Sequence, residues 1–109
     1  MSAPKVRDVC TGGLAIHLMI FEKSGDVNLG HSHIYHHHSF VGRGRVLVES
    51  NGKSVEVGEC ELIFIPAGIV HVLTALEDNT SVMCLHAVKD EEIGDIIDQS
   101  VIPPGTHGV

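Results

Sequence analysis

The chain has 109 residues, enough for one domain with a single hydrophobic core. Its residues are 43% hydrophobic and 19% charged, so the composition excludes an intrinsically disordered protein. With 14 acidic and 7 basic side chains the formal charge is −7, which makes nucleic acid and anionic membranes poor partners. No apolar run approaches the roughly 20 residues that span a bilayer, and no signal peptide opens the sequence, so we expect a cytoplasmic protein.

The first predicted strand covers residues 14–22, an apolar run that lies between a Gly-Gly pair and a Ser-Gly-Asp turn. The next two runs, at residues 46–49 and 54–57, are joined through Asn51 and Gly52, and an Asn-Gly turn in this position predicts a β-hairpin. Further strands are predicted at residues 62–65, 71–76 and 81–88. Six or more short strands with almost no helical periodicity indicate an all-β sandwich or barrel.

Only residues 90–99 have a helical pattern, because Ile93, Ile96 and Ile97 share one face and Asp90 can cap the first turn. We therefore expect one all-β domain over residues 1–109 with a short C-terminal helical segment. The barrel core is expected at about residues 14–88 and the tail at residues 89–109.

Histidine is the unusual residue type, with nine in the chain and five of them between residues 31 and 38. His31 and His33 are two residues apart in a segment expected to be extended, so their side chains leave the same face about 6 to 7 Å apart at the backbone. Neutral imidazole binds zinc, copper, iron, nickel and manganese, whereas calcium and magnesium prefer oxygen ligands. The spacing is one that chelates a transition metal, but a solvated or hydrogen-bonded pair of histidines has the same spacing, so the surrounding sequence decides between them.

Two blocks of sequence extend this pattern. The first contains His31, His33, His37 and, after six residues, Gly44; the second reads Pro66, one residue, Gly68, two residues, His71. In this order and spacing they resemble the two motifs of the cupin superfamily, in a small single-domain cupin of the cupin 2 type. The resemblance implies a double-stranded β-helix, or jelly-roll barrel, for the fold.

The resemblance also implies a ligand set for one divalent transition metal, either Fe, Ni, Zn, Cu or Mn: His31, His33, His37 and His71. His37 stands where the family usually has glutamate, so the first shell loses a negative charge and the ion becomes a stronger Lewis acid. Two other departures, Cys60 for a glycine and Ala75 for an asparagine, do not involve the metal.

The alternation of a strand leaves two candidates for the third ligand. If His37 points inward, then Ser39 and Val41 share its face while His38 points outward. The opposite register would place His38 inside, and the family permits either spacing. The six-residue interval to Gly44 favours His37.

The implied site leaves one or two coordination positions open, as catalysis requires. A metal-dependent small-molecule enzyme is therefore expected, first a dioxygenase-type oxidoreductase on a small chelating substrate, and second an isomerase or lyase. A non-catalytic metal- or metabolite-binding cupin is the other alternative, because one fold hosts many functions. The catalytic residues stay unassigned, since the sequence shows no clear general base apart from the ligands.

The remaining histidines, the tyrosine and the cysteines give weaker indications of a role. His17 and His86 lie in predicted strands, where a core or interface role is the first expectation, and Tyr35 is expected to face solvent, with substrate contact as the alternative. Cys10, Cys60 and Cys84 are expected to be buried free thiols. Ile63, Ile65, Leu73 and Met83 are expected to line the barrel.

The strand at residues 14–22 is apolar on both faces, which is more than one small barrel can bury. Such a strand is an association site, and a two-fold dimer is the default among soluble oligomers. We expect a homodimer.

Overall fold

The computed structural model describes residues 2–30 and 32–87 of the chain, and within them every regular element is a β-strand. The strands are β1 (Lys5–Thr11), β2 (Leu14–Phe21), β3 (Val27–Asn28), β4 (His37–Arg43), β5 (Arg45–Ser50), β6 (Lys53–Gly58), β7 (Leu62–Ile65), β8 (Val72–Ala75) and β9 (Thr80–Ala87). Since these residues form no helix, none of them provides a helical membrane span.

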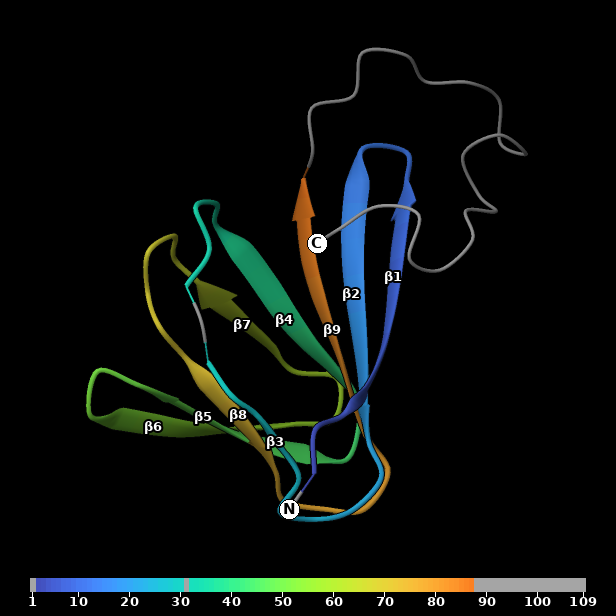
Figure 1. The fold of residues 1–109 in the computed structure, drawn as a ribbon, viewed down its shortest axis with the longest axis vertical. Coiled ribbons are helices and arrows are strands. Elements are labelled where there is room, and N and C mark those ends of the chain that lie inside the picture. The colour runs from blue at the N-terminus through green and yellow to red at the C-terminus, as the bar shows by residue number, and fades with distance from the viewer. Residues whose placement is uncertain (1, 31, 88–109) are drawn as a thin grey trace.

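Two antiparallel sheets make up the fold, with strand orders β1-β2-β9-β4-β7 and β3-β8-β5-β6. The chain crosses repeatedly from one sheet to the other, so strands that are distant in sequence become neighbours. Figure 1 shows the five-stranded sheet fanning out from β1 to β7, with the four-stranded sheet at its lower left. The predicted all-β double-stranded β-helix is confirmed.

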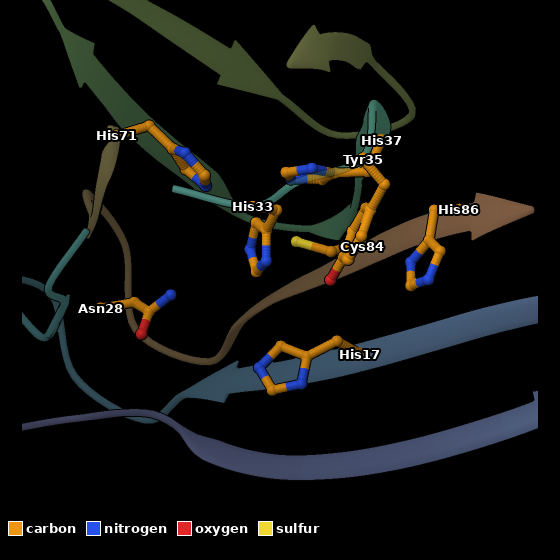
Figure 2. A pocket seen from close by; sticks show the side chains of 8 residues that line it. All are labelled: His17, Asn28, His33, Tyr35, His37, His71, Cys84 and His86. Atoms are coloured by element: carbon orange, nitrogen blue, oxygen red, sulfur yellow. The ribbon is translucent and has the colours of Figure 1, made fainter. Parts of the chain in front are cut away.

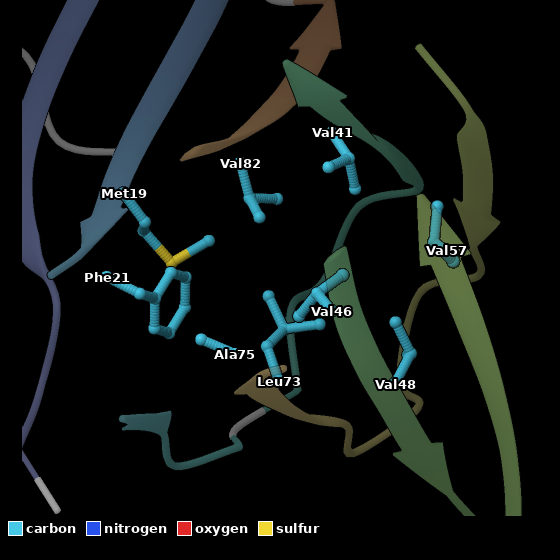
Figure 3. Close-up of a cluster of buried hydrophobic side chains, with 9 residues drawn as sticks. All are labelled: Met19, Phe21, Val41, Val46, Val48, Val57, Leu73, Ala75 and Val82. Atoms are coloured by element: carbon cyan, nitrogen blue, oxygen red, sulfur yellow. The ribbon is translucent and has the colours of Figure 1, made fainter. Parts of the chain in front are cut away.

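The hydrophobic core lies between the sheets, and each sheet contributes aliphatic side chains to it (Figure 3). Its members are Met19, Phe21, Val41 and Val82 from the five-stranded sheet, and Val46, Val48, Val57, Leu73 and Ala75 from the other. The histidine pocket described below is built on the same inward face of the five-stranded sheet, so the core fixes the strands that carry it.

Turn chemistry explains two of the connections. Asn51 and Gly52 both have positive φ, of 51° and 73°, and join β5 to β6 in the predicted hairpin. Gly44 joins β4 to β5 with φ of 82°, and a Cβ there would lie 2.3 Å from Oγ1 of the buried Thr80. Only glycine therefore fits this position of the first sequence motif.

The predicted strands from residue 14 to residue 87 are present, but β1 was not predicted. Charged Lys5, Arg7 and Asp8 interrupt its apolar pattern, and it forms because it pairs along its whole length with β2. β2 is consequently an internal strand rather than an exposed one. The helical segment at residues 90–99 and the tail lie outside the described residues.

One expected barrel-lining residue faces the other way. Val82 is fully buried and Cys84 packs against the core, so Met83 between them points to the outer face of the five-stranded sheet. Ile65 and Leu73 are buried, and Ile63 packs against the core as expected. The outer face around Met83 is apolar, and strand alternation places there Ile16, Leu18, Ile20, Phe40, Leu62, Phe64 and Leu85.

Candidate metal centre

Three histidines from different parts of the chain meet at one place. His33 comes from the loop after β3, His37 begins β4, and His71 directly precedes β8. One potential ligand atom from each lies within 4.8 Å of the other two. The ring centroids are 5.0 Å apart for His33 and His37, and 5.3 Å apart for His37 and His71. Figure 2 shows the three rings gathered on one side of a shared pocket.

The register of β4 places His37 inside and His38 outside. The side chain of His37 is 3% exposed and lies on the inward face with Ser39 and Val41. His38 is exposed on the opposite face, where its ring packs against Phe64 at a centroid distance of 5.1 Å. The register that the interval to Gly44 favoured is thus the one that the structure shows.

Hydrogen bonds between the two sequence motifs hold the site together. The Gly68 N–H donates to the carbonyl oxygen of His33 at 2.7 Å. The Ala67 N–H donates to Nδ1 of His36 at 2.9 Å. The loop of the second motif therefore holds the backbone of His33 and the side chain of His36, on the two sides of Tyr35.

Gly30 fixes the position of His71 by close packing. A Cβ on Gly30 would lie 1.7 Å from the carbonyl oxygen of His71 and 2.4 Å from its carbonyl carbon. No other side chain fits without a movement of the His71 backbone, so the two segments are held in direct contact.

The imidazole ring of His37 is buried with its nitrogens unsatisfied among the described residues. Neither of its ring nitrogens has a hydrogen-bond partner among the described residues, although both are buried. Burial, together with the smaller effect of the nearby His33 and His71, lowers the pKa of His37 from 6.5 to about 4. The ring is therefore neutral at physiological pH and keeps a lone pair available.

His71 has its tautomer selected by the backbone. Its Nδ1 lies 3.1 Å from the carbonyl oxygen of Ile69. Because a carbonyl oxygen only accepts hydrogen bonds, Nδ1 carries the proton and Nε2 of the neutral ring carries the lone pair. Metal-binding histidines commonly donate their second nitrogen to a carbonyl in this way.

These residues fit a divalent transition metal. Two nitrogens bound to one ion at about 2.1 Å each lie at most about 4.2 Å apart, so the observed 4.8 Å spread needs only small side-chain rotations. An ion would also satisfy the unpartnered nitrogen of His37. His31, the fourth ligand implied by the sequence, lies outside the described residues. The ligand assignment stays a prediction.

The rest of the pocket is lined by aromatic and polar side chains. Its volume is about 60 Å³, and its lining comprises His17, Asn28, Tyr35, Cys84 and His86 besides the three histidines (Figure 2). Tyr35 stacks on His33 and on His86, with centroid distances of 4.8 and 3.8 Å. It is a half-buried pocket residue rather than a solvent-facing one, and burial raises its pKa.

A carboxylate bonded to the pocket residue His17 was missed by the sequence analysis. Oδ1 of Asp8 lies 2.5 Å from Nδ1 of His17 across β1 and β2. Asp8 could have been found only through its pairing with β2, because β1 itself was not predicted.

The expectation of buried thiols is wrong for Cys60, which is exposed in a turn with φ of 63°. Cys84 lies inside the barrel, and its Sγ is 3.2 Å from Oγ of Ser39.

Comparison with known proteins identifies the fold. No protein-family model matches the chain, and no curated protein matches it in sequence. Among solved structures, KdgF from Halomonas sp. has a TM-score of 0.65 and 23% identity over 77% of each chain. A cupin-2 domain protein from Shewanella frigidimarina has a TM-score of 0.64 and 16% identity over 80% of this chain and 83% of that one. A cupin superfamily protein from Desulfitobacterium hafniense has a TM-score of 0.65 and 10% identity over 82% and 83%.

The chain has the cupin fold. At these identities the likeness shows the fold alone. Within the cupin fold, His33, His37 and His71 lie together on the inward side of the barrel, as the two motifs implied.

The buried, unpartnered His37 generates a stability prediction for the metal-free protein. His37→Leu replaces a polar ring by an apolar side chain, so we expect the free energy of unfolding to rise by about 1 to 3 kcal/mol near neutral pH. The unfolded chain binds a proton at His37 below pH 6.5, whereas the folded chain resists it until about pH 4. The wild-type protein should therefore lose up to about 3 kcal/mol more than the variant as pH falls through this window.

Urea denaturation of EDTA-treated protein at about pH 7 and about pH 4.5 measures both effects. Parallel pH dependence in the two proteins, or a large loss of stability in the variant, contradicts the description of His37.

Proposed function

We propose that this cupin binds one divalent transition metal through His33, His37 and His71, with His31 as a fourth ligand, and uses it as a small-molecule enzyme. The observation that carries the proposal is the pair of buried ring nitrogens of His37, which have no hydrogen-bond partner in the described part of the chain and lie beside two other histidines. A protein gains nothing in stability from such a group, since an unsatisfied buried polar atom costs about 1 to 3 kcal/mol. A ligand role explains why it is kept.

The reaction class proposed first is that of a dioxygenase acting on a small chelating substrate. When bound, a metal in an all-imidazole site can activate dioxygen if it is iron, or polarise a carbonyl if it is another divalent ion. The chain's own residues confine the substrate, because Tyr35 and His86 form a stacked wall and the cavity is small. Asn28 places an amide at the same pocket for hydrogen bonding.

An isomerase or lyase is the second candidate, and one observation favours it. His17 lines the pocket and its Nδ1 is bonded to Asp8, so this histidine can exchange protons with a substrate, as isomerases and lyases need. A non-catalytic, metal-binding cupin would show metal without turnover.

Metal binding tests the central part of the proposal. Untagged wild-type protein, dialysed against zinc and then against buffer, should retain about one equivalent by elemental analysis. His37→Ala and His71→Ala should each reduce zinc affinity at least about 10-fold while the β circular-dichroism signal persists, because the core that holds the sheets is aliphatic. His38→Ala is the matched control, since His38 lies on the outer face, and it should retain zinc.

Zinc content in the wild type that stays below about a tenth of an equivalent after reconstitution would remove the basis of the proposal. Equal zinc retention by His37→Ala and His38→Ala would exclude His37 as a ligand.

Oxygen uptake separates the reaction classes. Protein reconstituted anaerobically with Fe(II) and mixed with diketone or catechol-like compounds should consume dioxygen faster than the same iron in buffer or with His71→Ala. The expectation follows from the ligand role of His71. Absence of uptake with every reconstituted metal counts against the dioxygenase and leaves the proton-transfer class.

We also propose that the chain forms a homodimer through the outer face of the five-stranded sheet. The centre of this face consists of uncharged side chains such as Leu18, Phe40 and Met83, and a two-fold interface sets one patch against its own copy. Light scattering should give a dimer mass at micromolar concentration. Phe64→Glu on this face should shift the protein to monomer, whereas Val55→Glu at a similarly exposed position of β6 should not. A wild-type monomer refutes the proposal.

A further inference from the structure

We propose that Asp8 and His17 form an acid–base pair of this site, in which His17 takes a proton from a small enolisable carbonyl compound and Asp8 positions its ring. The inference rests on the proposed function, because the substrate must be held beside the three histidines. It adds a catalytic residue that sits on a different part of the barrel from any of the metal ligands.

The pairing of β1 with β2 sets up the contact. Asp8 and His17 are directly opposed in the antiparallel register, and both point to the inward face of the sheet. Oδ1 of Asp8 and Nδ1 of His17 are 2.5 Å apart, and the side chains are 24% and 26% exposed. The pair is therefore sheltered by the barrel and still reachable from the pocket.

The carboxylate defines the tautomer of His17. An ionised carboxylate accepts hydrogen bonds and donates none, so Nδ1 of His17 carries the proton. In the neutral ring Nε2 then holds the lone pair, and His17 lines the pocket that it shares with His33, His37 and His71. A base oriented through its other nitrogen by a carboxylate is a recurrent arrangement for proton abstraction.

The sheet sets the distance between this base and the histidine cluster. His17 on β2 is opposed to Cys84 on β9, which in turn is opposed to Ser39 on β4, two residues after His37. His17 and Ser39 are thus two strand spacings, or about 10 Å, apart at the backbone, and His37 lies two residues further along β4. Figure 2 shows His17 on the β2 side of the pocket, with His33 and Tyr35 between it and His37. A substrate of a few heavy atoms can reach both sides.

The neighbouring groups of the pocket are less suited to this role. Burial raises the pKa of the Cys84 thiol and of the Tyr35 hydroxyl, which keeps both protonated. His86 is stacked on Tyr35, and burial lowers its pKa. A carboxylate next to His17 stabilises the imidazolium that forms when Nε2 accepts a proton.

The step balances without an oxidant. The C–H bond next to the substrate carbonyl breaks, its electron pair stays on the substrate as an enolate, and an N–H bond forms at Nε2 of His17. The positive charge of the ring is held against the Asp8 carboxylate. Return of the proton to another substrate atom gives an isomerisation, and return to the same atom gives exchange with solvent.

The tautomer of His17 tests the pair without any metal. In ¹⁵N NMR of the metal-free protein, His17 should be protonated at Nδ1 in the wild type. Asp8→Asn should shift the ring toward the Nε2–H tautomer, while Asp78→Asn, a substitution of a carboxylate that instead accepts from the Ser24 N–H, should leave it unchanged. A wild-type His17 protonated at Nε2 overturns the proposal.

Solvent exchange tests the base directly. Zinc-loaded protein in D₂O is mixed with pyruvate or hydroxyacetone, and deuterium uptake next to the carbonyl is followed by proton NMR against the same zinc in buffer. His17→Gln should slow exchange about 100-fold with zinc content unchanged. His38→Gln is the matched control and should exchange at the wild-type rate.

Equal exchange by wild type and His17→Gln overturns the role of His17, and no exchange of either probe by zinc-loaded wild type overturns the substrate class. Failure of the wild type to hold zinc is a failure of the proposed function instead, and in that case the tautomer measurement still decides whether Asp8 positions His17.

Discussion

The burial of His37 is the constraint on which the site depends. A 3% exposed imidazole whose two nitrogens have no hydrogen-bond partner within residues 2–30 and 32–87 is a cost to the fold. Burial and the neighbouring histidines lower its pKa to about 4, which keeps the ring neutral. The same features make it a good ligand, because a neutral, rigidly held nitrogen needs neither deprotonation nor reorientation to bind a metal. His37 therefore lowers the stability of the fold at the position where His33 and His71 meet it.

Backbone contacts between the segments that carry the histidines help to set this geometry. The Gly68 N–H holds the His33 carbonyl, and Gly30 lies against the His71 carbonyl so closely that any side chain would collide. Gly30 therefore lets two histidine-bearing segments lie in direct contact, while Gly68 connects two such segments through its N–H. On the other side of the pocket, β1 brings Asp8 to His17, so this pair and the three histidines are carried by different segments of the barrel.

Local patterns in the sequence predicted the parts of the fold that local chemistry determines. The Asn51-Gly52 hairpin follows from turn preferences, and the inward register of His37 follows from its interval to Gly44. What depended on tertiary pairing was not predicted: β1 is too polar to be recognised before its partner β2 is known, and Asp8 was missed with it. Met83 was placed in the barrel because an apolar residue suits either face, and only pairing with neighbours decides between them.

The most direct test is to locate a bound metal ion in the protein. Crystals of the zinc-loaded protein, with anomalous diffraction recorded at the zinc edge, should show one strong peak within bonding distance, about 2.0 to 2.1 Å, of ring nitrogens of His33, His37 and His71. The same map would show whether His31 completes the shell. An anomalous peak elsewhere, or none at these histidines in crystals whose zinc content is stoichiometric, would contradict the account.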